Sequence, residues 1–221
     1  MNKLLGSVDK IPQPSPENGV NTDMSVAAAI EHDAQLMLQV RDGDTASFGL
    51  LLERHRVPVI HFVYRMIQNQ AIAEELAQEV FLRVYRSRAT YEPTAKFTTW
   101  LFRITTHLAL NWIRDQKNER RQQSLDSEAP EGTAPLQVAD AGPNVEQRMV
   151  KSARMDEIRR AIAELPDKQR AAVMMHKYEE MDYQQIAGVL SCSESAVKSL
   201  LFRAYESLRS KLAHLNRSVS E

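Results

Sequence analysis

The amino-acid sequence predicts an all-α protein, with two small helical domains joined by a flexible acidic linker. Three observations favour this fold class. Apolar residues recur with a period near 3.6 over most of the chain, and no segment shows the alternation typical of a half-buried strand. Proline and glycine account for only 9 and 7 of the 221 residues, so long helices meet few interruptions. A segment rich in Pro, Gly, Ser and Asp, residues 124–144, divides the helical pattern in two.

These features predict five parts of the chain. In order, they are a disordered leader at 1–22, a helical unit at 23–122, the linker at 123–144, a second helical unit at 145–213 and a tail at 214–221. The single cysteine excludes a disulfide framework and a cysteine-rich zinc site. No apolar run reaches the roughly 18 to 20 residues that cross a bilayer. We therefore expect a soluble cytoplasmic protein without membrane insertion.

The helices of the first unit are expected in the following places. The first contains "DAQLMLQV" and ends at the turn Asp42-Gly43-Asp44. Thr45 is the expected cap of the second, which contains "SFGLLLERHRVPVIHFVYRMI" with a kink expected at Pro58. The third and fourth are expected at about 71–86 and 96–120.

The second unit begins near Val145 with a helix containing "RMDEIRRAIAEL". Pro166 suits the first turn of the next helix, and a short helix "DYQQIAGVL" follows. Ser191 and Glu194 have the spacing of a capping box, so the last helix is expected to begin there. A short helix, a tight turn and a longer helix indicate a helix-turn-helix.

Charge is unevenly distributed, although the formal net charge is only −1. Residues 83–121 contain nine basic and three acidic residues, and residues 195–217 contain five basic and one acidic. Between them, residues 122–147 contain five acidic residues and no basic one. This alternation indicates several distinct surfaces.

The last helix has an outward stripe opposite its buried apolar one. In a helix-turn-helix, such a face enters the DNA major groove, where Lys and Arg bind guanine or phosphate and Ser bonds to either. Phe202 could pack on a thymine methyl group, or it could instead close a contact with a neighbouring helix. The stripe consists of Ser195, Lys198, Ser199, Phe202 and Arg203, followed by Glu206.

Two other helices have surfaces that suit binding. Glu75, Gln78 and Glu79 form a compact acidic patch that suits a basic protein surface, or simply a solvated face. The helix over 96–121 interleaves basic residues with aromatic ones, a pattern that suits single-stranded DNA. Its Trp100 fits an apolar stripe and is more typical of a core residue.

Catalysis finds little support in the sequence. None of the six histidines has a Glu three residues upstream, so the Glu-x-x-His pairs of helical di-metal sites are absent. The sequence also lacks a phosphate-binding glycine loop and a G-x-S-x-G nucleophile motif. We expect no enzyme activity, no cofactor and no metal.

Three segments resemble the extracytoplasmic-function (ECF) sigma factors of the sigma-70 family. "AEELAQEVFLRVYR" resembles the segment that binds the β′ clamp helices of RNA polymerase, with Glu75 where the family commonly has Asp. "KFTTWLFRI" matches the F-x-T-W-L-x-R-I signature that leads into promoter melting and −10 recognition. "LPDKQRAAVMMHKYEEMDYQQIAGVLSCSESAVKSLLFRAYESL" resembles the −35-binding domain.

The resemblance implies a sigma factor that binds core polymerase and directs promoter-specific initiation, with its two domains held apart on the two promoter elements. It implies contacts to the β′ clamp helices and the β flap, and often a membrane-linked anti-sigma partner. The acidic linker would follow the RNA exit path. His107 stands where the family often has Asn. The implied contacts are Glu75, Gln78, Glu79 and Phe81 for polymerase, Tyr91, Lys96, Arg103, Thr106 and His107 for −10 DNA, and Tyr183, Ser195, Lys198, Ser199, Phe202 and Arg203 for −35 DNA.

Two other classes of protein fit the residues. A free-standing helix-turn-helix regulator would need a dimer seam or a ligand pocket but no polymerase. A structural helical adaptor would form no specific DNA complex even with polymerase present.

Overall fold

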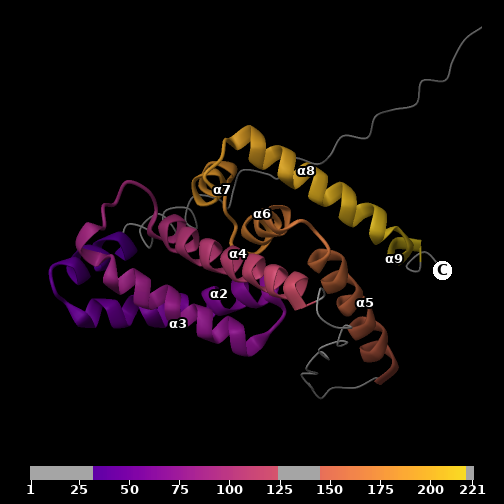
Figure 1. Cartoon of the computed structure of the whole chain (residues 1–221), viewed down its shortest axis with the longest axis horizontal. Helices are drawn as coiled ribbons and strands as arrows, with labels where there is room; N and C mark the ends of the chain where they lie inside the picture. Colours follow the sequence, from indigo (N-terminus) through magenta and orange to yellow (C-terminus); the bar gives the residue numbers. More distant parts are fainter. Residues whose placement is uncertain (1–31, 124–144, 218–221) are drawn as a thin grey trace, which may run out of the picture.

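The computed structural model describes residues 32–123 and 145–217, and all regular structure in these two ranges is helical (Figure 1). We call the first range the N-terminal unit and the second the C-terminal unit. The predicted leader, and the predicted linker apart from residue 123, lie outside the described residues.

The N-terminal unit begins with a helix over residues 32–41, which ends at the predicted Asp42–Gly43 turn. Gly43 has a φ of 105°, a conformation that side chains with a Cβ rarely adopt. Three long helices and one 3₁₀ turn follow, which are α2 (Thr45–Ile67), α3 (Gln70–Arg86), η1 (Arg88–Thr90) and α4 (Phe97–Gln123).

The N-cap of α2 differs from the sequence prediction. Its N-cap is Asp44, whose side chain accepts a hydrogen bond from the Ala46 amide, and the expected cap Thr45 is the first helical residue. Aspartate is one of the strongest capping residues, and its negative charge also suits the positive end of the helix dipole. The helix contains Pro58 and runs on to Ile67, the end of the segment that the sequence predicted, and the kink at Pro58 stays a prediction.

The C-terminal unit contains five helices, which are α5 (Val145–Ala163), α6 (Asp167–Tyr178), α7 (Tyr183–Leu190), α8 (Glu194–Lys211) and α9 (Ala213–Arg217). Pro166 is the N-cap of α6, next to the predicted first turn. Helices α7 and α8 form the predicted helix-turn-helix, with Ser191 in the turn at a φ of 51°.

The predicted capping box at Ser191 and Glu194 is wrong. Ser191 is instead the C-cap of α7, and Ser193 caps α8 by accepting a hydrogen bond from the Ala196 amide. Ser191 cannot cap α8 because its left-handed backbone differs from the extended backbone that an N-cap requires. A capping box does occur at the start of α7, where Asp182 and Gln185 exchange hydrogen bonds.

The two units pack against each other. Helix α4 contacts α7, and α2 contacts α6, so that α6 and α7 form a layer between the N-terminal unit and α8 (Figure 1). The buried apolar side chains of both units form one continuous cluster. The arrangement in this structure is therefore compact, whereas the resemblance implied domains held apart on DNA.

Candidate nucleic-acid and protein interfaces

The surface of α3 presents the predicted acidic patch. Glu75 and Gln78 are exposed. Glu79 is half-buried, and its carboxylate accepts a hydrogen bond from Arg83 Nε at 2.8 Å. Leu82 is 50% exposed and lies seven residues after Glu75, which places both on one face of the helix. The α3 face therefore combines acidic residues with an exposed apolar one.

Phe81, the predicted apolar contact on α3, lies elsewhere. Its side chain is only 5% exposed and belongs to the core. The sequence reasoning missed Leu82, although its spacing from Glu75 and Gln78 is a signal that could have found it.

The residues predicted for −10 DNA divide into two groups. Lys96, Arg103 and His107 are exposed. Tyr91 is 2% exposed and Thr106 is fully buried, and neither hydroxyl has a hydrogen-bond partner. Since both are enclosed, DNA cannot reach these two side chains in this conformation.

Tyr91 is held in an aromatic cluster before and at the start of α4. Its ring centroid lies 4.9 Å from that of Trp100 and 6.3 Å from that of Phe97, both in edge-on geometry. Such pairs add to the stability that burial gives. Trp100 therefore packs against other aromatic rings, in agreement with its interpretation as a core residue. Tyr91 supports the loop between α3 and α4.

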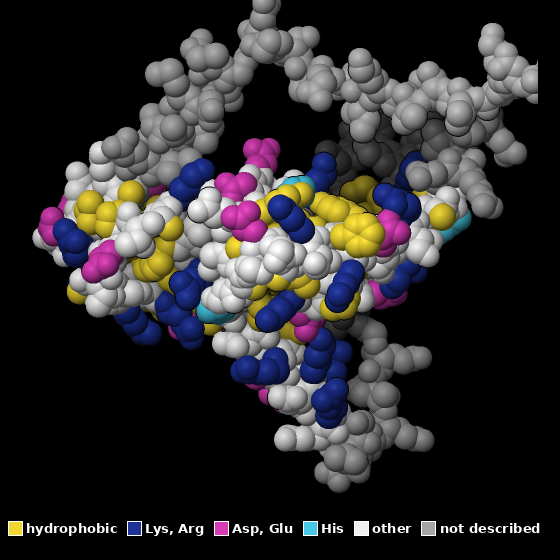
Figure 2. Space-filling model, turned by 90° about the horizontal axis from the view of Figure 1, so that it is seen from above, with side chains coloured by type: hydrophobic (Ala, Val, Ile, Leu, Met, Phe, Trp, Pro, Cys, Tyr) yellow, Lys and Arg dark blue, Asp and Glu magenta, His cyan; other side chains and the backbone are white. Residues whose placement is uncertain are grey.

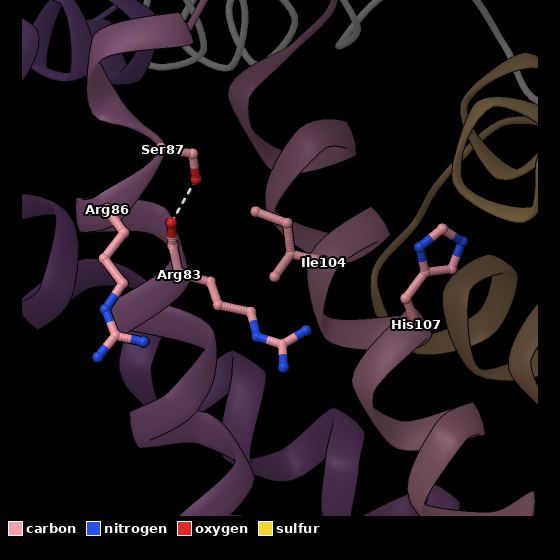
Figure 3. Close-up of a pocket in the computed structure, with 5 residues that line it drawn as sticks. All are labelled: Arg83, Arg86, Ser87, Ile104 and His107. Carbon is pink, nitrogen blue, oxygen red and sulfur yellow. Dashed lines mark hydrogen bonds between the residues drawn. The ribbon is translucent and has the colours of Figure 1, made fainter.

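A pocket of about 450 Å³ lies between α3 and α4 (Figure 3). Its lining residues are Arg83, Arg86, Ser87, Ile104 and His107. The Arg83 side chain extends toward the gap between the two helices in Figure 3, opposite Ile104. The Arg86 and His107 side chains point away from this gap, and the Ser87 hydroxyl donates to the Arg83 carbonyl oxygen (Figure 3). A guanidinium group beside an apolar side chain suits a phosphate.

The two arginines of this pocket differ in their bonding. Arg83 pairs with Glu79, whereas Arg86 is exposed and forms no ion pair with any residue in the two described ranges. The sequence reasoning did not single out either arginine. Arg83 and Arg86 are three residues apart and hence neighbours on the helix, which is the signal that was available.

The outward stripe of α8 is fully exposed. Ser195, Lys198, Ser199 and Arg203 all face solvent, and Phe202 is 68% exposed. The buried residues Val197, Leu201 and Ala204 hold the opposite side of the helix. Phe202 therefore does not close a contact with a neighbouring helix, which removes the alternative that the sequence left open.

An aromatic cluster flanks this stripe. The ring of His176 stacks on Tyr183 at 5.7 Å, and its Nδ1 lies 3.1 Å from the Tyr205 hydroxyl. Burial raises the pKa of the Tyr205 hydroxyl, and the nearby Tyr183 raises it further. The Tyr205 hydroxyl therefore keeps its proton. The Lys198 ammonium lies 5.7 Å over the ring of Tyr183. Figure 2, seen from above, shows Lys and Arg side chains among exposed hydrophobic ones on the side where α8 lies.

A buried charged cluster lies in the N-terminal unit, away from these surfaces. His55 Nε2 lies 2.9 Å from Asp33 Oδ2, and Arg54 bonds to the other oxygen of the same carboxylate. Burial would raise the pKa of Asp33, but the hydrogen bonds and charges of His55 and Arg54 outweigh it and lower that pKa. The cluster has satisfied partners and joins the first helix to α2.

The described parts of the chain contain neither a cluster of metal ligands nor a membrane-spanning helix. Within residues 32–123 and 145–217, no three His, Cys, Asp or Glu side chains gather to hold a metal ion. No helix in these ranges is long and apolar enough to cross a membrane.

Known families match both units. The family described as Sigma-70 region 2 matches residues 51–119, and the one described as Sigma-70, region 4 matches residues 155–208. The chain is 32% identical to the ECF RNA polymerase sigma factor SigW of Bacillus subtilis, over 80% of this chain and 95% of the relative. The chain belongs to the ECF group of the sigma-70 family. It is an RNA polymerase sigma factor, as its sequence indicated.

A second sigma factor is similar to this chain over most of its length. The RNA polymerase sigma factor CarQ of Myxococcus xanthus is 32% identical, over 83% of this sigma factor and 99% of the relative. Region 2 thus contains most of α2, all of α3 and most of α4, and region 4 contains the end of α5, all of α6 and α7 and most of α8.

Solved structures share the fold of this sigma factor. The structure of CnrH in complex with the cytosolic domain of CnrY has a TM-score of 0.59 and 19% identity, and covers 82% of this chain and 97% of that one. The sigma factor RpoE in complex with the anti-sigma factor NepR from Bartonella quintana has a TM-score of 0.58 and 21% identity, and covers 75% and 96%. The overall fold of the chain is therefore shared with these two structures.

Proposed function

We propose that this sigma factor binds core RNA polymerase through α3 and directs initiation by reading the promoter with α4 and α8. The observation that carries the proposal is the exposed stripe of α8. Phe202 is 68% exposed between Lys198 and Arg203, on a helix whose other side is fixed in the core. An exposed aromatic between two cations suits a groove that offers both methyl groups and phosphates.

The polymerase surface is the α3 face with Glu75, Gln78 and Leu82. Exposed carboxylates attract a basic partner, and Leu82 supplies apolar area that a partner can bury. Glu79 orders Arg83 and contributes less free charge, because the two form an ion pair. Phe81 supports this face from the core, where its burial fixes α3. The β′ clamp helices are the proposed partner, and the β flap is the proposed partner of region 4.

The −10 strand is proposed to contact Lys96, Arg103 and His107 and to pass over the pocket between α3 and α4. Single-stranded DNA needs cations for its phosphates and flat surfaces for its bases. Arg86 has no ion-pair partner among the described residues, so its guanidinium is available to a phosphate. Tyr91 supports the adjoining loop through Trp100.

The −35 duplex is proposed to contact Ser195, Lys198, Ser199, Phe202 and Arg203. Tyr183 lies beside them at the first residue of α7 and is 38% exposed. The start of the first helix in a helix-turn-helix crosses the DNA backbone. We therefore assign Tyr183 to a phosphate contact and the α8 residues to the groove.

Other properties follow from membership of the family. We propose that the chain has no catalytic activity of its own and works in the cytoplasm, where core polymerase is found. An anti-sigma factor is a further proposed partner, supported by the solved structure of RpoE in complex with the anti-sigma factor NepR.

The deciding experiment is run-off transcription with purified core polymerase and a library of genomic promoter fragments. Discrete transcripts that require both the chain and core polymerase support the proposal. A free-standing regulator would instead bind DNA fragments tightly without polymerase and would fail to co-purify with it. A structural adaptor would yield no transcript and no specific DNA complex.

A further inference from the structure

His176 of α6 contacts both helices of the helix-turn-helix. Its imidazole ring stacks on the ring of Tyr183, the first residue of α7, with the centroids 5.7 Å apart and the planes inclined by 22°. Its Nδ1 lies 3.1 Å from the hydroxyl oxygen of Tyr205 in α8, and these two rings meet edge-on at 6.3 Å. One half-buried side chain thus links three helices that contact one another (Figure 1).

The hydrogen bond to Tyr205 fixes the imidazole. Burial raises the pKa of Tyr205, so its hydroxyl keeps its proton and can donate it to the ring of His176. Nδ1 is then the acceptor, and the neutral imidazole carries its proton on Nε2. A ring that has one hydrogen bond and one stacked neighbour has little freedom to rotate. His176 therefore presents a fixed flat surface to Tyr183.

Tyr183 connects this cluster to the outward stripe of α8. The Lys198 ammonium lies 5.7 Å over the Tyr183 ring, within the range of a cation–π interaction. Tyr205 follows Lys198 by seven residues and therefore shares its face of α8. The proposed function assigns Tyr183 and Lys198 to the −35 duplex, and it gives no role to His176 or Tyr205.

The order of these side chains matters for binding. A side chain that DNA must immobilise loses rotamer freedom, and this loss weakens the complex. His176 limits the freedom of the Tyr183 ring before DNA arrives, and that ring attracts the Lys198 ammonium to one place. Tyr183 is 38% exposed and Tyr205 is 37% exposed, so the cluster lies at the surface where the duplex is proposed to bind.

We propose that His176, fixed by Tyr205, is a positioning residue of the −35 surface, and that it orders Tyr183 and Lys198 for their contact with the duplex. This role rests on the proposed function of α7 and α8. His176 and Tyr205 act through Tyr183, so their effect on promoter binding requires the Tyr183 ring.

A promoter titration tests the hydrogen bond. Full-length variants are assembled with purified core polymerase, and the concentration of a promoter fragment that gives half-maximal run-off is measured. Tyr205→Phe removes the hydroxyl and retains the ring, so it should raise this concentration roughly two- to tenfold, the range for one net hydrogen bond. The control Tyr178→Phe removes the hydroxyl of an exposed tyrosine on the same helix as His176, and it should change nothing. An unchanged concentration for Tyr205→Phe would overturn the proposal.

Double variants show whether the effect passes through Tyr183. Tyr205→Phe should add no further loss of promoter binding to Tyr183→Ala, and none to His176→Ala, because the route to the duplex is already broken. A merely structural hydroxyl, or one that bonds to DNA itself, would add its full loss in the Tyr183→Ala background. Additive losses would therefore overturn the positioning role.

The positioning role and the proposed function can fail separately. If Tyr183→Ala and Lys198→Ala left promoter binding unchanged, the proposed −35 surface would be wrong, and the positioning role with it. If these two variants weakened binding while Tyr205→Phe did not, the positioning role alone would be wrong. Tyr205→Phe decides between these outcomes because it removes one oxygen atom, whereas His176→Ala also removes packed area.

Discussion

Glu179 of α6 lies 3.6 Å from Arg65 of α2, yet its pKa is raised to about 7. Burial disfavours the carboxylate and raises the pKa, and the charge of Arg65 opposes this shift only in part. A carboxylate at the junction of the two regions therefore changes its charge near neutral pH.

This pKa predicts how stability depends on pH. Folded protein retains the Glu179 proton between the ordinary pKa of 4.5 and about 7, where the unfolded chain releases it. The free energy of unfolding should therefore fall as pH rises through this interval, by up to about 3 kcal/mol from this group. Glu179→Gln should remove this contribution and be more stable than wild type at pH 8. Urea unfolding at several pH values measures the difference.

The control for this pH dependence is Glu180→Gln, because Glu180 is the exposed neighbour. It should retain the wild-type pH profile. If Glu179→Gln and wild type kept parallel profiles from pH 5 to 8, the assignment to Glu179 would be wrong.

The second prediction concerns the buried cluster of Asp33, His55 and Arg54. Asp33→Asn should lower the free energy of unfolding by roughly 3 kcal/mol, because it removes the buried carboxylate charge that bonds to the Arg54 guanidinium and to the buried His55 ring. The contribution of Asp33 should be present above pH 3.8 and be lost as pH falls through its lowered pKa. Thermal unfolding measures the loss, and Asp42→Asn, in an exposed turn, should change stability little. Equal stability of the two variants would contradict this account.

The third prediction concerns the polymerase surface. Glu75→Lys and Leu82→Ala should each weaken competition for core polymerase several-fold, because one reverses a surface charge and the other removes exposed apolar area. Helicity should remain unchanged, since both side chains are outside the core. Asp42→Lys is the control, since it adds the same charge away from α3. Normal competition by both α3 variants would refute the assigned surface.

The fourth prediction separates promoter reading from stability on α8. Phe202→Ala and Arg203→Ala should change the free energy of unfolding by less than about 0.5 kcal/mol, since both side chains are exposed. Arg203→Ala should cost about 1 to 3 kcal/mol at promoters where it reads a guanine, and should weaken all promoters alike if it binds phosphate. Transcription from a panel of −35 variants distinguishes the two cases.

Leu201→Ala is the control for stability on this helix, because it changes a buried residue instead of an exposed one. Leu201 is buried, so the cavity should cost roughly 2 to 5 kcal/mol of stability. If Lys198→Ala and Arg203→Ala both transcribed every −35 variant at wild-type levels, α8 would not be the groove-binding helix.

The helices could be predicted from the sequence because their apolar period is strong. The third helix was expected at about 71–86 and is Gln70–Arg86. The helix ends were harder, since Ser191 and Ser193 are both capping residues and only backbone geometry selects between them. The apolar period also predicted the outward stripe of α8, because all residues of this stripe lie on the face of one helix opposite its buried side.

The burial of Phe81, Tyr91 and Thr106 could not be predicted in this way. Each is enclosed through tertiary packing, and a helical repeat contains no information on which helix lies opposite. Arg83 and Arg86 line a pocket between α3 and α4, and the spacing within one helix indicates that they are neighbours but not that α4 lies opposite them. The apolar period of a sequence thus predicts helices well. It predicts a binding surface only where a single helix forms that surface.

Gly188 of α7 faces Thr99 of α4, and a Cβ added to this glycine would lie 3.6 Å from the Thr99 methyl group, an ordinary van der Waals distance. Alanine would therefore fit at position 188 without moving α4, whereas a side chain that extends further toward Thr99 would have to displace one of the two helices. A mutant library at position 188 that is selected for resistance to proteolysis should consequently retain glycine and alanine and lose the large side chains.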